Sequence, residues 1–254
     1  MRPQIVFIGQ CLGALCLFAA MSTVVPVSSS FASVEKPGEA RMIRRSSIQG
    51  PSSAAAIISR MNEQHHWQKL HLDHFSVLRT YTVEDDKGKT VAEEIVHMEY
   101  RAPGTETFTI ASASGSAFIR GHVFKKLMKR EGERAKHPED RDRALTTDNY
   151  AFDVLRKERV NGSDCTVIHA VPKRKRIYLF EGVIWIDERD FAVVKAAGRL
   201  SKNPSFWIKR VDFVRQYQKI GEFWLPQKEQ SVAKVRIYGT KVLKIDYQKY
   251  SINQ

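Results

Sequence analysis

The sequence predicts a mainly β protein with two or three helices, built on one long antiparallel meander. From Phe75 onward, segments of alternating apolar and polar residues follow one another with short turns between them. Alternation with a period of two is typical of half-buried strands. The dipeptide Asn161-Gly162 lies between two such segments and indicates a tight hairpin. Only residues 54–65 and 118–134 have helical spacing instead.

The first helix is expected to begin just after Pro51, with Ser53 as its N-cap. Its apolar face consists of Ala54, Ile57, Ile58, Met61 and His65. Ten strands are then expected, over residues 75–83, 90–100, 105–111, 149–160, 165–171, 177–187, 191–200, 207–220, 222–237 and 241–250. A meander of this length can curl on itself. Residues 177–187 are apolar on both faces, which is typical of a strand at the centre of a sheet.

Residues 118–134 interrupt the strands with a basic amphipathic helix. Its apolar face consists of Ile119, Val123, Phe124, Leu127 and Met128, and its basic face of Lys125, Lys126 and Lys129. Such a helix could be a mobile lid that covers an apolar cavity and offers its lysines to an anionic membrane surface. It could equally be packed permanently on the sheet, and the pattern does not separate these two interpretations.

The N-terminus has the features of a secretory signal peptide. Arg2 precedes an apolar stretch, and Ser30-Phe31-Ala32 places small residues before a cut at Ser33. We therefore expect a signal peptide over residues 1–32, a flexible leader over 33–50 and a single domain over 51–254. Cleavage leaves Cys165 as the only cysteine, so the exported chain would have no internal disulfide. These features predict a periplasmic protein.

No catalytic motif is present in the sequence, and we expect neither an enzyme nor a cofactor. Cys165 lies among strand residues, where a buried thiol is usual. The histidines between His65 and His74 are expected to be polar residues at a helix end, not metal ligands. The net charge of +13 favours an anionic partner, which outside the cytoplasm is lipid headgroup and not nucleic acid. A solvated basic surface is the alternative, and we expect a monomer.

The strands are rich in aromatic residues. A curved sheet closed by helices can leave a cavity for acyl chains, and such residues could line it. They could also simply fill the core. The candidate ligand-binding residues, which include three from the helix, are Phe124, Leu127, Met128, Phe180, Trp185, Trp207, Phe213 and Trp224.

Two motifs resemble those of the lipoprotein-carrier superfamily, which includes the periplasmic lipoprotein chaperone and proteins of the outer membrane lipoprotein-sorting group. A tryptophan-bearing strand ends in Asp before a turn, at residues 182–187, and a later Gly-x-x-Trp-x-Pro covers residues 221–226. The resemblance implies an unclosed antiparallel β-barrel, a half-barrel lidded by helices, that holds lipid or acyl chains. In the chaperone an arginine directly before a proline helps to hold the lid. Here Arg101 stands one place earlier, which turns its side chain to the other face of the strand.

We therefore expect a non-enzymatic periplasmic carrier or binding protein for lipids or lipoprotein acyl chains, acting in outer-membrane lipoprotein sorting. A membrane-bound donor or acceptor protein would be a further partner. The alternative is an envelope-stress sensor that binds a partner protein and uses the same cavity to detect a signal. A third possibility is a structural envelope protein with a filled core.

Overall fold

The computed structural model describes residues 53–135 and 144–253 of the chain. The expected signal peptide (1–32) and leader (33–50) lie outside the described residues. The helical elements are α1 (Ala54–His71), α2 (Ala117–Ile119), the π-helical turn η3 (Arg120–Phe124) and α3 (Lys125–Ala135). The strands are β1 (His74–Glu84), β2 (Thr90–Arg101), β3 (Thr105–Gly115), β4 (Tyr150–Val160), β5 (Ser163–Pro172), β6 (Phe180–Asp187), β7 (Val193–Leu200), β8 (Ile208–Ile220), β9 (Phe223–Val235) and β10 (Gly239–Ile252).

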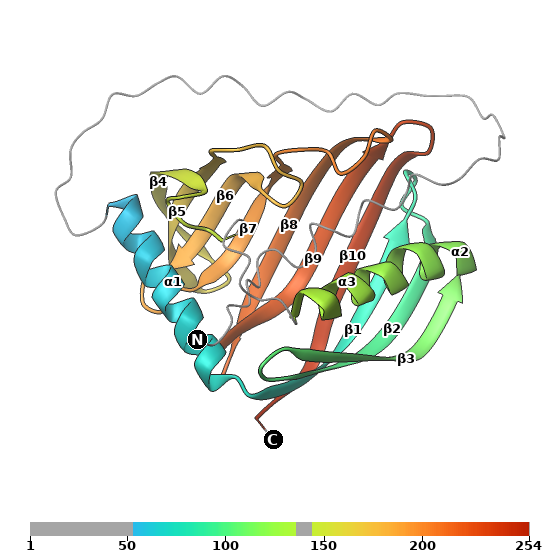
Figure 1. The fold of residues 1–254 in the computed structure, drawn as a ribbon, viewed down its shortest axis with the longest axis horizontal. Coiled ribbons are helices and arrows are strands. Elements are labelled where there is room, and N and C mark those ends of the chain that lie inside the picture. Colours follow the sequence, from blue (N-terminus) through green and yellow to red (C-terminus); the bar gives the residue numbers. More distant parts are fainter. Residues whose placement is uncertain (1–52, 136–143, 254) are drawn as a thin grey trace.

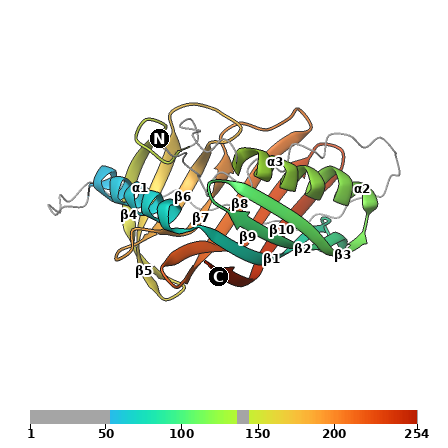
Figure 2. The same cartoon turned by 60° about the horizontal axis from the view of Figure 1, so that its bottom comes forward.

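All ten strands form one antiparallel sheet, in the order β3-β2-β1-β10-β9-β8-β7-β6-β5-β4. Two consecutive meanders, β1–β3 and β4–β10, are joined where β1 pairs with β10. Strands β3 and β4 are the two edges of the sheet and do not pair with each other. Figure 2 shows the sheet curving beneath the helices without closing. The predicted fold class, an unclosed antiparallel β-barrel with helices, is confirmed.

The two faces of the sheet differ in burial. Along β1 the buried and partly exposed residues alternate strictly, as expected for a strand with one face packed against other elements. We call the buried side the inner face; on β1 it bears Phe75, Val77, Arg79, Tyr81 and Val83. Figure 1 shows both long helices on one side of the sheet, with α1 near β4–β6 and α3 near β1–β3. The core lies between the inner face and these helices.

Helix α1 begins as predicted, because the Ser53 side chain accepts a hydrogen bond from the backbone N–H of Ala56 at 3.3 Å. The Gln68 side chain fixes its C-terminal half. The Gln68 amide accepts a hydrogen bond from the backbone N–H of Trp224 and donates one to the Trp224 carbonyl, both at 3.0 Å. The Gln68 side chain thus pairs with the backbone N–H and C=O of Trp224 in the way that a residue of a neighbouring strand would.

The predicted helix over residues 118–134 is present but irregular. Its middle is a π-helical turn, in which the backbone N–H of Lys125 donates to the carbonyl of Arg120. Nevertheless, the predicted faces are correct. Val123, Phe124, Leu127 and Met128 are buried, and Lys125, Lys126 and Lys129 are exposed.

The prediction that residues 177–187 form a central strand is wrong. Strand β6 begins only at Phe180 and is third from the β4 edge. On its outer face Trp185 is buried without a further layer, because the ammonium of Lys195 lies 4.7 Å from the centre of the Trp185 ring. Within the described ranges, no helix is long and apolar enough to cross a membrane.

Candidate functional site

Helix α3 and the π-helical turn before it lie on the inner face of β1–β3 (Figures 1 and 2). The ring of Phe124 packs on that of Tyr81, with 5.7 Å between the ring centres. Leu127 is fully buried and Met128 nearly so. The three predicted lid residues therefore face the sheet, while the three predicted membrane-contact lysines face solvent.

A buried ion pair joins α3 to the sheet. Nη1 of Arg79 donates hydrogen bonds to both carboxylate oxygens of Glu131, each at 2.9 Å, and both side chains are only 3% exposed. The Tyr81 hydroxyl accepts a further bond from Arg79 at 3.2 Å. Burial alone would lower the pKa of Arg79, but the Glu131 carboxylate, together with Tyr81, Tyr247 and Glu106, outweighs burial and raises the pKa well above its usual value. We call this pair the latch.

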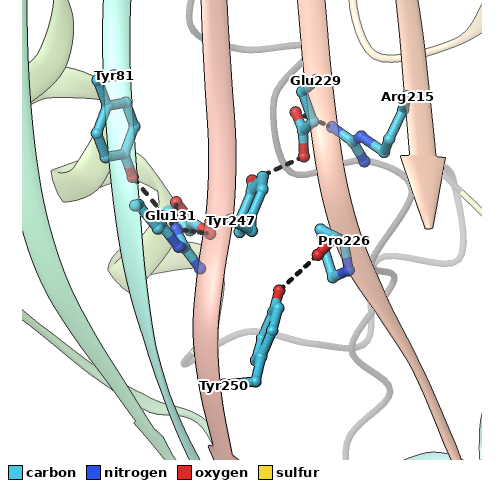
Figure 3. A network of polar contacts seen from close by, with 8 residues as sticks. Tyr81, Glu131, Arg215, Pro226, Glu229, Tyr247 and Tyr250 are labelled. Atoms are coloured by element: carbon cyan, nitrogen blue, oxygen red, sulfur yellow. Dashed lines mark hydrogen bonds and ion pairs between the residues drawn. The ribbon is translucent and has the colours of Figure 1, made fainter. Parts of the chain in front are cut away.

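A second buried pair lies beside the latch on the inner face, as Figure 3 shows. Nη2 of Arg215 on β8 donates to Glu229 on β9 at 2.9 Å, and Glu229 accepts another bond from the Tyr247 hydroxyl at 2.8 Å. The ring of Tyr247 also lies under the Arg79 guanidinium, 5.0 Å from it. The middle of the inner face therefore carries a connected set of buried charges instead of a purely apolar core.

A groove of about 470 Å³ opens between α3 and the β3 edge. It is lined by Glu94, Phe108, Ile110, Ala117, Arg120, Gly121, Lys125 and Met128. Its walls are mostly apolar, and Ile110 within it is 54% exposed. Burial raises the pKa of Glu94, which lines the groove, although the nearby positive charge of Arg120 opposes this shift.

The structure divides the predicted strand residues into separate groups. Phe180 and Phe213 meet edge to face on the inner face, with ring centres 5.1 Å apart, and both are buried. Trp224 is buried near the β8–β9 turn, where its indole N–H donates to Asp190 at 2.8 Å. Trp185 is on the outer face, and Trp207 precedes β8 with 38% of its surface exposed. These residues therefore do not line one common cavity.

Two other pockets are more polar in character. One, of about 410 Å³, lies near the β8–β9 turn and includes Asp187, Asp190 and Trp224. The other, of about 310 Å³, lies beside α1 and includes His65, His66 and Lys69, whose pKa burial lowers to about 7. No group of three potential metal ligands occurs among the residues that the structure describes.

Arg79, Glu94, Arg120 and Glu131 are the site residues that the sequence analysis missed. A signal for two of them was present. Arg79 stands between Val77 and Tyr81, and Glu94 between Ala92 and Val96, so both are charged residues at inward positions of an alternating strand. A charge at such a position requires a partner or a function. Arg101, which the sequence places one position before the family's lid arginine, is exposed near Glu99.

A protein-family model described as "Family of unknown function (DUF5686)" matches residues 143–251, which include β4 to β9 and almost all of β10. No curated protein matches the chain. A solved structure of a DUF1329 family protein from Desulfovibrio piger is 12% identical, with a TM-score of 0.43, and the match covers 78% of this chain and 92% of that chain.

A LolA superfamily protein from Nitrosomonas europaea is also 12% identical, with a TM-score of 0.41 and coverage of 80% of this chain and 94% of that chain. The putative outer membrane lipoprotein-sorting protein domain from Vibrio parahaemolyticus is 11% identical, with a TM-score of 0.41 and coverage of 78% and 92%. Solved members of the superfamily that the strand motifs resemble are thus among the structures similar to this chain.

Proposed function

We propose that this protein is a non-enzymatic periplasmic carrier or binding protein for lipids or lipoprotein acyl chains. The observation that carries the proposal is the mostly apolar groove beneath an amphipathic helix. The groove is within the size range of sites that bind small molecules. Its exposed Ile110, together with Phe108 and Met128, offers an acyl chain an apolar surface.

Binding would be driven by the transfer of methylene groups from water onto this surface, at about 0.8 kcal/mol for each buried methylene. Helix α3 is the element that would have to move for an acyl chain to pass from the groove toward the middle of the inner face. Its apolar side chains and the latch hold it closed. The exposed lysines Lys125, Lys126 and Lys129 would bring it to an anionic membrane, where lipid is collected or delivered.

The groove is tested by placing a charge in it. Ile110→Glu changes an exposed residue on the β3 edge, so the fold should tolerate it. Val154→Glu on the β4 edge is the matched control, because Val154 is also exposed (45%) and on the opposite edge strand. We expect Ile110→Glu to weaken the uptake of a fluorescent fatty acid at least tenfold and Val154→Glu to leave it unchanged. Equal uptake by both variants and the wild type would contradict the proposed site.

A further inference from the structure

The groove contains a carboxylate that neither the fold nor the proposed function uses. Strand β2 turns Glu94 to the inner face, where the residue is only 3% exposed. Among the described residues, its Oε2 has no hydrogen-bond partner, and Glu94 makes no ion pair within 4 Å. A buried carboxylate without a partner destabilises a fold. Few buried polar groups in native proteins lack a partner, and such groups are enriched at functional sites.

A cation stands across the same groove. Arg120, in the π-helical turn, lines the groove, and its Nε is buried with no hydrogen-bond partner in the described part of the chain. Lys125, one turn further on, is exposed at the groove. Arg120 is close enough to Glu94 to influence it electrostatically, but the two do not form an ion pair. An unsatisfied acceptor and an unsatisfied donor therefore border one apolar groove.

We propose that the groove recognises a lipid with a zwitterionic headgroup that combines a phosphate and a primary ammonium. Arg120 and Lys125 bind the phosphate, Glu94 binds the ammonium, and the acyl chain lies along Phe108 and Ile110. This inference rests on the proposed lipid-binding function and specifies its ligand class. The guanidinium suits a phosphate because it donates in a planar fork.

Other headgroups fit these residues less well. A purely anionic headgroup would satisfy Arg120 but would leave Glu94 without a partner, with a second negative charge nearby. A quaternary ammonium carries no N–H, so it could not donate a hydrogen bond to Oε2 of Glu94. A primary ammonium carries three donors, as the lysine side chain does. Glu94 therefore selects among lipids by the amine.

The test compares three lysophospholipids with the same acyl chain, bearing ethanolamine, choline or glycerol headgroups. Their binding to the purified protein is measured by calorimetry below the micellar concentration. We expect the wild type to bind the ethanolamine lipid about tenfold more tightly than the other two, which corresponds to one charge-assisted hydrogen bond. Glu94→Gln should abolish this preference, whereas Arg120→Gln should weaken the binding of all three.

Glu93→Gln is the matched control, because Glu93 is the neighbouring residue on the same strand and points to the other face. It should keep the preference. If the three lipids bind the wild type equally and Glu94→Gln changes nothing, the headgroup assignment is overturned while lipid binding stands. If none of the three binds, the proposed function itself fails. Melting curves of each variant show whether a lost affinity comes from a lost fold.

Discussion

Removing the charge of Glu131 should detach helix α3 from the sheet. Glu131→Gln leaves the Arg79 guanidinium 3% exposed and without its counterion. Breaking a buried pair by removing one partner costs about 3–5 kcal/mol, because the remaining charge stays desolvated. The same substitution at Glu133 is the control. Glu133 pairs with Lys129 on the solvent side of the same helix, at 3.8 Å with both side chains exposed, and such a pair contributes about 0.3–0.5 kcal/mol.

Hydrogen exchange and urea unfolding together measure this effect. If α3 opens alone, its amides should exchange at least a hundredfold faster in Glu131→Gln, since each 1.4 kcal/mol corresponds to about tenfold. Glu229→Gln removes the charge of the other buried pair, which involves no residue of α3. It should lower the stability of the sheet without a selective change in α3.

A double variant separates the ion pair from simple packing. Arg79→Met with Glu131→Leu removes both charges and keeps apolar volume at the contact. Replacing a whole buried pair in this way is often neutral or stabilising by about 1–4 kcal/mol. We therefore expect the double variant to protect α3 at least as well as the wild type. If Glu131→Gln costs no more than Glu133→Gln, the latch does not hold the helix, and this reasoning is refuted.

Three further predictions follow from the electrostatics. Burial raises the pKa of Glu94, so its contribution to stability is present at low pH and is lost as the pH rises through that pKa. Glu94→Gln should therefore raise the melting temperature at neutral pH and have less effect near pH 4. A lower melting temperature of this variant at neutral pH would contradict the prediction. Burial also raises the pKa of the Cys165 thiol to about 11, so the folded protein should react with a thiol reagent far more slowly than the urea-unfolded chain. Changing Lys125, Lys126 and Lys129 together to glutamine should weaken binding to anionic vesicles, since each lysine near such a surface contributes about 1 kcal/mol. Unchanged vesicle binding would mean that the basic face of the helix is only a solvated surface.

The number of strands was predictable because each depends on local features. Alternation and turn residues such as Asn161-Gly162 act within a few positions, and the ten strands match them. The pairing of β1 with β10 was not predictable, because it joins segments more than 150 residues apart and no local period encodes it. The position of β6 was predicted wrongly because the sequence does not show what covers an apolar strand face. Trp185 on the outer face of that strand is covered by the side chain of Lys195, not by another layer.

The candidate site was only half predictable. The apolar and basic faces of the helix follow from helical spacing, and the structure has both. The latch depends on where that helix lies against the sheet, which spacing cannot determine. Arg79 showed that an inward charge needed a partner, but nothing in the sequence singled out Glu131 from the other acidic residues.

The junction between β1 and β10 imposes an order on folding. Strand β1 has β2 as a neighbour from the start, but its other edge stays unpaired until residues 239–252 have been synthesised. The three-stranded sheet β1–β3 must wait for strand β10 before it becomes part of the larger sheet. Pairings between distant segments form slowly and leave strand edges open to wrong partners in the meantime. A nascent chain that stops before β10 would therefore expose two unfinished sheets, which makes it a natural client for a holding chaperone.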